Sequence, residues 1–286
     1  INMRIKELLE CNRTEYIMEV HDSLSARIIE NAGFKGAWCS SFSLSATKGL
    51  RDINEMTMTD VLNVVDEITS ATKIPVLLDA DNGYGDFNNS MLLVKKAEKI
   101  KTSGICIEDK KFPKVNSLID NRQQQMLSIS EFCKKIDAMC NVREISDLSI
   151  VARTEGFIYD ESAQEVVNRA QEYVNAGADA IFIHSRKKDI TDIQEFFKLW
   201  KCDKPVVICP TTYCDTEPEV YSKLGVSMVI WGNHMLRAAV NNMQYVAKRI
   251  YEDKKIISLD NNLTSVNNIF QLQHMDEYYE NLKKFG

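Results

Sequence analysis

Features that mark special architectures are scarce in this sequence. It has 11 glycines and 5 prolines among 286 residues, which excludes collagen-like and low-complexity chains. No apolar run approaches the roughly 18–20 residues that cross a bilayer. No run of Lys and Arg forms a nucleic-acid footprint, and the formal charge of −6 also argues against one. A chain of this length buries enough surface to fold without disulfides or a structural metal.

The eight cysteines form neither a disulfide framework nor a zinc site. No two of them make a Cys-x-x-Cys pair, and no Cys/His cluster has zinc-ligand spacing. Cys106 and Cys209 lie inside apolar runs, where a free thiol behaves as a small core residue. We therefore expect reduced thiols. Because the charged N-terminus also lacks a signal-peptide core, we expect a cytoplasmic protein.

Short apolar, β-branched segments recur along the chain and predict strands. Most are apolar at nearly every position, which is typical of strands covered on both faces. Amphipathic segments between them predict helices, and a Gly precedes several strands as a helix stop signal. The eight predicted strands are 16–22, 36–41, 75–81, 104–109, 149–157, 180–185, 205–213 and 228–234.

The alternation of strands with helices indicates parallel βαβ units, and eight of them favour an α/β fold closed into a (β/α)8 TIM-type barrel. An open doubly wound sheet is the alternative, but its G-x-G-x-x-G signature after the first strand is missing. No linker divides the sequence. We expect one barrel domain over 1–286, with a lid at about 110–127 and a helical C-terminal extension at about 243–286.

Carboxylates gather at the carboxyl ends of neighbouring predicted strands, where the active sites of such barrels lie. Asp79 and Asp81 end the third strand, and alternation would point both side chains to one face. Glu108 ends the fourth strand, and Asp52 follows the second. Acids without Cys or His partners suit Mg²⁺ or Mn²⁺ rather than Zn²⁺. A solvated loop with scattered acids is the alternative, but unpaired carboxylates at adjacent strand ends would repel one another.

Two side chains that can carry positive charge stand at other strand ends. Arg153 lies in an otherwise apolar strand, where its guanidinium could bind a carboxylate or phosphate. The alternative is a structural pair with Glu155 on the same face. His184 ends the sixth strand; a lone His is more often a hydrogen-bonded core residue, and its barrel-mouth position is what makes it a candidate.

The polar segment 110–125 is long for a connection between a strand and a helix, and Pro113 blocks helix formation within it. Long connections in compact domains are usually lids or disordered excursions. Lys114, Asn116 and Ser117 would give a lid that donates hydrogen bonds to an anion.

These segments together resemble the phosphoenolpyruvate mutase family of the isocitrate lyase superfamily. Glu-Asp-Lys-Lys-Phe-Pro-Lys-Val-Asn-Ser at 108–117 is similar to the signature segment of the mutase branch, and Leu-Asp-Ala-Asp-Asn-Gly-Tyr-Gly at 78–85 to the superfamily's metal motif. Segments 178–185, 225–238 and 265–273 also resemble that family, so the similarity covers nearly the whole chain.

The resemblance implies a (β/α)8 barrel whose last helix is swapped between the subunits of a homodimer or homotetramer. It implies a Mg²⁺, with Mn²⁺ as a possible substitute, ligated directly by Asp79. Asp52, Asp81 and Glu108 would then act mainly through metal-bound water. Lys114 would lie on the gating lid.

The resemblance also implies a substrate site. The pyruvyl carboxylate would be held by Trp38 and the backbone around Ser40, Ser41 and Phe42. The chain departs from the family there, because the family often has Ser-Gly-Leu at these three positions. The residues around the phosphoryl group would be Arg153, His184, Asn116, Ser117 and Leu118.

The implied activity interconverts phosphoenolpyruvate and phosphonopyruvate by moving a phosphoryl group from oxygen to carbon, which serves phosphonate biosynthesis. Phosphonopyruvate hydrolase is the nearest alternative, with the same metal site and a lid that admits water. Carbon–carbon lyases of the isocitrate or methylisocitrate type carry a lid with a catalytic Cys, which this lid lacks. A non-catalytic scaffold is disfavoured by the acids, Arg153 and His184. A downstream phosphonopyruvate decarboxylase is the expected functional partner.

Overall fold

The structure is a computed structural model that describes residues 3–119, 123–256 and 261–286. Its contacts divide the chain into two compact units, Ile1–Asn233 and His234–Gly286, which we describe separately. The predicted lid includes 120–122 and the predicted C-terminal extension includes 257–260; these parts of the two predictions lie outside the described residues.

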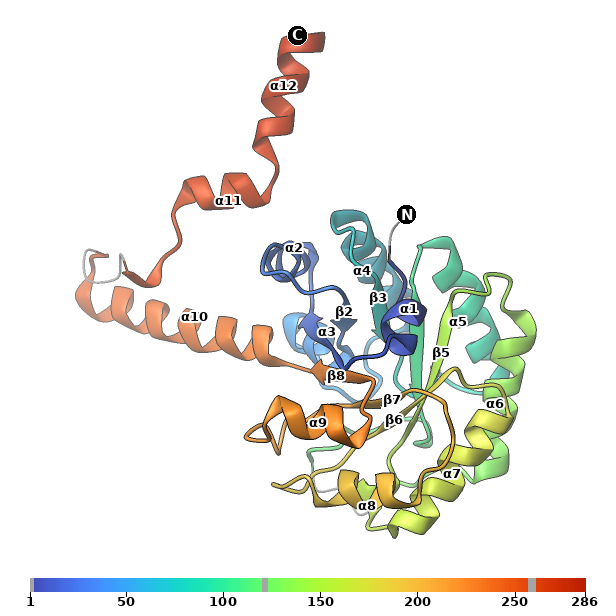
Figure 1. The fold of residues 1–286 in the computed structure, drawn as a ribbon. Coiled ribbons are helices and arrows are strands. Elements are labelled where there is room, and N and C mark those ends of the chain that lie inside the picture. The colour runs from blue at the N-terminus through green and yellow to red at the C-terminus, as the bar shows by residue number, and fades with distance from the viewer. Residues whose placement is uncertain (1–2, 120–122, 257–260) are drawn as a thin grey trace. The chain divides into compact units, whose positions relative to one another are not determined.

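Eight parallel strands form a closed barrel in the first unit (Figure 1). They follow one another in chain order around the barrel, and the first pairs with the eighth. Each overlaps a predicted strand, so the prediction of a (β/α)8 TIM-type barrel is confirmed. The strands are β1 Glu15–Val20, β2 Ala37–Cys39, β3 Val76–Asp79, β4 Gly104–Glu108, β5 Ser149–Thr154, β6 Ala180–Ile183, β7 Val206–Ile208 and β8 Met228–Trp231.

Helices connect the strands and surround the barrel (Figure 1). Several begin at residues whose side chains cap the first turn, since Thr57, Ser128 and Ser162 each accept a hydrogen bond from the backbone N–H three residues on. The first-unit helices are α1 Ile5–Glu10, α2 Ser23–Asn31, α3 Ser41–Thr47, α4 Met58–Ala71, α5 Phe87–Lys99, α6 Ile129–Val142, the 3₁₀ helix η1 Gly156–Tyr159, α7 Ala163–Asn175, α8 Thr191–Leu199 and α9 Pro218–Leu224.

Apolar side chains fill the barrel, and α1 packs against the strands where they begin. A Cβ atom at Gly36 would lie 2.8 Å from Ile17 and 2.9 Å from Leu8, so glycine allows this close approach. The buried core cluster comprises Ile5, Leu8, Leu9, Ile17, Trp38, Leu77, Cys106, Val151, Ala180, Phe182, Val207, Cys209, Met228 and Ile230. A packed interior leaves chemistry to the carboxyl ends of the strands.

The third strand ends at Asp79, two residues earlier than predicted. Asp81 has φ +50°, so the chain has already turned and the same-face alternation expected for the two aspartates does not apply. Tertiary contacts hold this turn: the Glu108 N–H donates to the Asp81 carbonyl at 2.7 Å, and the Lys135 ammonium donates to the carbonyls of Asn82 and Gly85.

The second unit is helical in its described residues. It contains α10 His234–Asp253, α11 Val266–Leu272 and α12 Met275–Phe285. Its first helix, α10, begins nine residues before the predicted start of the C-terminal extension, and that extension of a single barrel domain stays a prediction. The exchange of a helix between subunits stays a prediction. None of the described helices is long and apolar enough to cross a membrane.

Candidate active site

A cavity opens at the carboxyl ends of the strands, and most of the predicted site residues line it. Asp81 and Glu108 are the predicted residues that do not line it, but each is buried against a residue that does. The lining residues are Trp38, Ser40, Ser41, Phe42, Asp52, Asp79, Lys114, Asn116, Ser117, Leu118, Arg153, Phe182, His184, Cys209, Thr211, Gly232 and Asn233. The structure thus brings together side chains spread over more than a hundred residues of sequence.

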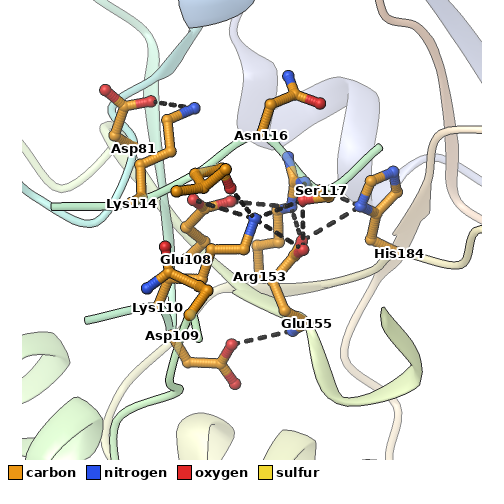
Figure 2. A network of polar contacts seen from close by, with 12 residues as sticks. Asp81, Glu108, Asp109, Lys110, Lys114, Asn116, Ser117, Arg153, Glu155 and His184 are labelled. Atoms are coloured by element: carbon orange, nitrogen blue, oxygen red, sulfur yellow. Dashed lines mark hydrogen bonds and ion pairs between the residues drawn. The ribbon is translucent and has the colours of Figure 1, made fainter. Parts of the chain in front are cut away.

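The acidic side of the cavity is organised around Lys114. Its Nζ atom lies 2.7 Å from Oδ1 of Asp52. The same atom lies 2.8 Å from Oδ1 of Asp81, the contact drawn in Figure 2. Asp79 is held separately, since its Oδ2 accepts hydrogen bonds from the Ser41 hydroxyl at 2.8 Å and from the Ser41 N–H at 3.2 Å. One ammonium is therefore shared by two buried carboxylates.

The pKa values in this cluster follow from burial and from that shared cation. Burial lowers the pKa of the Lys114 ammonium, but Asp81 and Asp52 raise it well above its ordinary value. Burial raises the pKa of Asp81 to about 7, against the opposing effect of Lys114. Burial also raises the pKa of Asp52, but Lys114 more than offsets this, so its pKa is lowered. Lys114 is thus charged and Asp52 ionised at neutral pH.

The oxygen atoms of these acids are the type of ligand that Mg²⁺ prefers, although the acids are not arranged around a common metal position. Within the described ranges, no three His, Cys, Asp or Glu side chains converge as a metal site. However, Oε1 of Glu108 is buried and accepts no hydrogen bond, and Oδ1 of Asp52 and Oδ1 of Asp81 are buried against the Lys114 ammonium, each with a lone pair to spare. Carboxylate oxygens with unused lone pairs are the ligands that Mg²⁺ takes. The donor set fits this ion, and the cation that lies among the acids in this structure is the Lys114 ammonium.

The opposite side of the cavity carries Arg153 and His184. Nε of Arg153 lies 2.5 Å from Oε1 of Glu155, and its Nη2 lies 2.8 Å from Nδ1 of His184 and 3.0 Å from Oγ of Ser117. The guanidinium also stands over the Phe182 ring, 5.0 Å from its centroid. Arg153 therefore pairs with Glu155, as the structural interpretation expected, and it also lines the cavity; its binding of an anion stays a prediction.

His184 is neutral at pH 7. Burial lowers the pKa of its imidazole, and the charge of Arg153 lowers it further. Nδ1 lies 2.8 Å from the Arg153 guanidinium, which can only donate, and 3.2 Å from the Glu155 carboxylate, which can only accept. The shorter contact favours Nδ1 as the acceptor, with the proton on Nε2. The cavity therefore presents a cationic guanidinium beside a neutral N–H donor.

Two buried charged residues that sequence reasoning did not propose as functional stand behind this pair. Lys110 and Glu155 have exposed fractions of 1% and 0%, and their side chains lie 3.2 Å apart. From the sequence we expected Glu155 only as a structural partner of Arg153, and we did not select Lys110. A signal was present, since each follows a proposed site residue, Glu108 or Arg153, by two positions.

Several known proteins are similar to this chain in sequence and in fold. The family model described as phosphoenolpyruvate phosphomutase matches residues 5–251. Phosphoenolpyruvate phosphomutase of Tetrahymena pyriformis is 44% identical, and the match covers 99% of this chain and 94% of that protein. The crystal structure of phosphoenolpyruvate phosphomutase from Streptomyces platensis subsp. rosaceus is 36% identical, with a TM-score of 0.96 and 98% of each chain covered.

A phosphonopyruvate hydrolase is also similar. Its structure in complex with oxalate and Mg²⁺ is 37% identical to this chain, with a TM-score of 0.91, and the match covers 98% of this chain and 97% of that one. A family-model match over residues 5–251 and a 44% identical relative matched along nearly its whole length establish descent as well as fold. This chain belongs to the phosphoenolpyruvate phosphomutase family.

Proposed function

We propose that this protein is an isomerase that interconverts phosphoenolpyruvate and 3-phosphonopyruvate by intramolecular phosphoryl transfer. The observation that carries the proposal is one cavity with acids on one side, Arg153 and His184 on the other, and lid residues Lys114 and Asn116 across it. This is an arrangement for a small anion with a carboxylate at one end and a phosphoryl group at the other. The Tetrahymena and Streptomyces relatives that carry the mutase name support this assignment.

Mg²⁺ is the proposed cofactor, with Mn²⁺ as a possible substitute. Asp79 would hold it, with Asp52, Asp81 and Glu108 around it; the similar hydrolase structure with oxalate and Mg²⁺ supports this choice. When bound, the ion supplies Lewis-acid stabilisation of the enolate charge that develops as the C–O or P–C bond breaks. Ser41 orients Asp79 for this role through its hydroxyl and N–H.

The carboxylate end of the substrate would lie beside these acids. Trp38, Ser40 and Phe42 line that part of the cavity, and the Trp38 ring is fixed edge-on against Phe182, with centroids 5.9 Å apart. The Ser41 N–H is bonded to Asp79, so the backbone donors left for the substrate would come from the neighbouring positions.

The phosphoryl end would lie against Arg153, His184 and Asn116. Phosphoryl transfer passes through a loose, metaphosphate-like group that needs positioning and charge stabilisation rather than a strong nucleophile. Arg153 would compensate the charge on the phosphoryl oxygens, while the Nε2–H of His184 and the amide of Asn116 would donate hydrogen bonds to them. With its oxygens held, the phosphorus can leave the enolate oxygen and bond to C3 of the same enolate.

Water is the competitor in this reaction, because it converts the transferring group to inorganic phosphate. The lid contacts oppose its entry. Nδ2 of Asn116 donates to Oδ2 of Asp52 at 2.6 Å, and the Lys114 N–H donates to Oδ1 of Asn54 at 2.6 Å. A hydrolase is the second candidate function, since a phosphonopyruvate hydrolase shares this fold at 37% identity.

³¹P NMR of the protein incubated with phosphonopyruvate and Mg²⁺ distinguishes the two functions. We expect the phosphonate signal to be replaced by that of phosphoenolpyruvate. The Asp79→Ala variant, prepared in the same way, is the control for contaminating enzymes and should leave the phosphonate unchanged. Inorganic phosphate as the dominant product would refute the mutase assignment in favour of a hydrolase.

The cellular setting is also proposed. Formation of the P–C bond is uphill, so a reaction that consumes phosphonopyruvate, such as its decarboxylation, would pull the equilibrium toward phosphonates. We place the enzyme in the cytoplasm as a homodimer or homotetramer that exchanges its last barrel helix.

A further inference from the structure

Glu155 is the most connected buried acid near the cavity, yet it does not line it. Its Oε1 lies 2.5 Å from Nε of Arg153 and 3.2 Å from Nδ1 of His184. Its Oε2 accepts a hydrogen bond from the Ser117 hydroxyl and lies 3.2 Å from Nζ of Lys110 (Figure 2). One carboxylate thus contacts two residues that line the same side of the cavity and two residues of the lid, Ser117 and Lys110 at its start.

Charge balance keeps this carboxylate ionised. Burial raises the pKa of Glu155, but Arg153 and Lys110 hold it well below its ordinary value. Glu108 is the second acid of the group, with Oε1 3.8 Å from Lys110 and Oε2 3.4 Å from Arg153. Two acids and two bases therefore form a neutral buried cluster, and removal of one member would leave an uncompensated charge.

The same cluster is attached to the lid on both sides of Asn116. Nζ of Lys110 donates to the Val115 carbonyl at 2.8 Å and to the Ser117 hydroxyl at 2.5 Å. Asn116 therefore lies between two residues that are both tied to the buried Lys110–Glu155 pair. A shift of this pair would displace the amide that we assign to the phosphoryl group.

The backbone of Glu155 is held in place by a second buried acid, Asp109. Its N–H donates to Oδ1 of Asp109 at 2.9 Å, and the Tyr173 hydroxyl donates to Oδ2 of the same carboxylate at 2.7 Å. Asp109 and Tyr173 are both buried. Glu155 is thus held by a rigid support on the barrel side, which suits a residue that anchors a loop.

We propose that Glu155 is a positioning residue that, with Lys110, latches the lid over the cavity through Ser117 while it orients Arg153. The catalytic part of this inference rests on the proposed function, because it assigns Asn116 and Arg153 to the phosphoryl group. The latch itself does not. Loss of the Glu155 charge would release the lid and admit water to the cavity.

Hydrogen–deuterium exchange of the substrate-free protein tests the latch without any assay of activity. The reporter is the lid peptide that contains the Lys114 N–H, which donates to Asn54 only while the lid is in place. In Glu155→Gln, loss of a charge-assisted hydrogen bond should speed exchange in this peptide by about tenfold or more. The barrel-strand peptides should exchange at the parent rate.

Two further variants make the result interpretable. Glu155→Gln with Lys110→Met removes one charge of each sign, so the cluster stays neutral and folds while the latch is lost; its lid should also exchange rapidly. Glu15→Gln replaces another buried glutamate, at the start of β1 and so at the opposite end of the barrel, and should leave the lid unchanged. Parent-like lid exchange in both Glu155 variants, or acceleration spread equally over the strands, would overturn the latch.

Kinetics supply the second readout. With phosphonopyruvate as substrate, Glu155→Gln should lose on the order of 10²-fold in kcat because Arg153 and Asn116 are misplaced. It should also release a larger share of inorganic phosphate than the parent. A variant with an opened lid but an unchanged product ratio would refute the role in excluding water. If the parent itself forms no phosphoenolpyruvate, the proposed function fails while the exchange result still decides the latch.

Discussion

Nζ of Lys114 lies 2.7 Å from Oδ1 of Asp52, so the segment that covers the cavity is tied by charge to the acids inside it. Both side chains are nearly fully buried, and Nζ of Lys114 also lies 2.8 Å from Oδ1 of Asp81. The lid and the proposed metal-binding acids are therefore one electrostatic unit. A change in the charge of the lid should therefore change the electrostatic energy of the acids, and a change in the acids should affect the lid in the same way.

Lys114→Met should destabilise the metal-free protein, because Asp52 and Asp81 lose the cation they share. Breaking such a buried pair costs about 3–5 kcal/mol. Urea denaturation in EDTA, compared with the same measurement in Mg²⁺, checks this. We expect added Mg²⁺ to recover more stability in the variant than in the parent. Equal stability of the two proteins in EDTA would contradict the shared-cation role.

Asp79→Ala should abolish turnover with little loss of fold, because it removes the proposed direct metal ligand at the mouth of the barrel. ³¹P NMR measures the turnover, and Mn²⁺ binding followed by electron paramagnetic resonance measures the site directly. Near-normal activity of this variant in Mg²⁺ would rule out the assignment of Asp79.

Asn116→Ala should lose most mutase activity, on the order of 10²–10³-fold, which is the usual cost of one lost transition-state donor. It should keep its fold, since Asn116 lies on a surface segment. Asn168→Ala, on the exposed face of α7, is the matched control and should retain parent activity. Steady-state rates with phosphonopyruvate are the measurement, and a loss of less than about threefold would count against Asn116.

Alkylation of accessible thiols should leave activity within about twofold of the untreated value. Cys39 and Cys106 are buried, and burial raises the pKa of each thiol, which makes it unreactive. Cys209 lines the cavity but is also buried with a raised pKa, while Cys214 is exposed. Iodoacetamide treatment followed by an activity assay checks this. Rapid inactivation that substrate prevents would instead favour a lyase-like thiol chemistry.

His21 should make part of the stability depend on pH. Burial lowers the pKa of its imidazole, but the hydrogen bond and charge of Glu19, 2.6 Å away, raise it above the unfolded value of 6.5. The contribution is therefore fully present below pH 6.5 and is lost as pH rises through the folded-state pKa. The difference in unfolding free energy between the parent and His21→Gln, from urea denaturation, should be larger at pH 6 than at pH 9. If this free-energy difference instead grew with pH, folding would lower the pKa of His21, and the prediction would be wrong.

The barrel and most of its site could be predicted from the sequence because both depend on local pattern. Strands covered on both faces are apolar along their length, and parallel strands bring their carboxyl ends to one edge whatever the details of packing. Asp79, Arg153 and His184 stand at such ends, so their convergence followed from the strand assignment alone. The lid was visible as a polar segment too long for a simple connection.

Tertiary structure decided which charges meet within that set. The strand pattern predicted Asp81 on the same strand face as Asp79, but the chain turns before Asp81. The Asp81 carbonyl accepts a hydrogen bond from the Glu108 N–H, and the Lys135 ammonium donates to two carbonyls of the loop that follows. Lys114 pairs with acids that lie 62 and 33 residues before it in the chain, at Asp52 and Asp81. Glu155 reaches Ser117 across 38 residues. These contacts depend on how the lid lies over the barrel. A buried charge is stabilised by whichever partner the folded chain brings within a few ångströms. The periodic pattern of a sequence does not encode which partner that is.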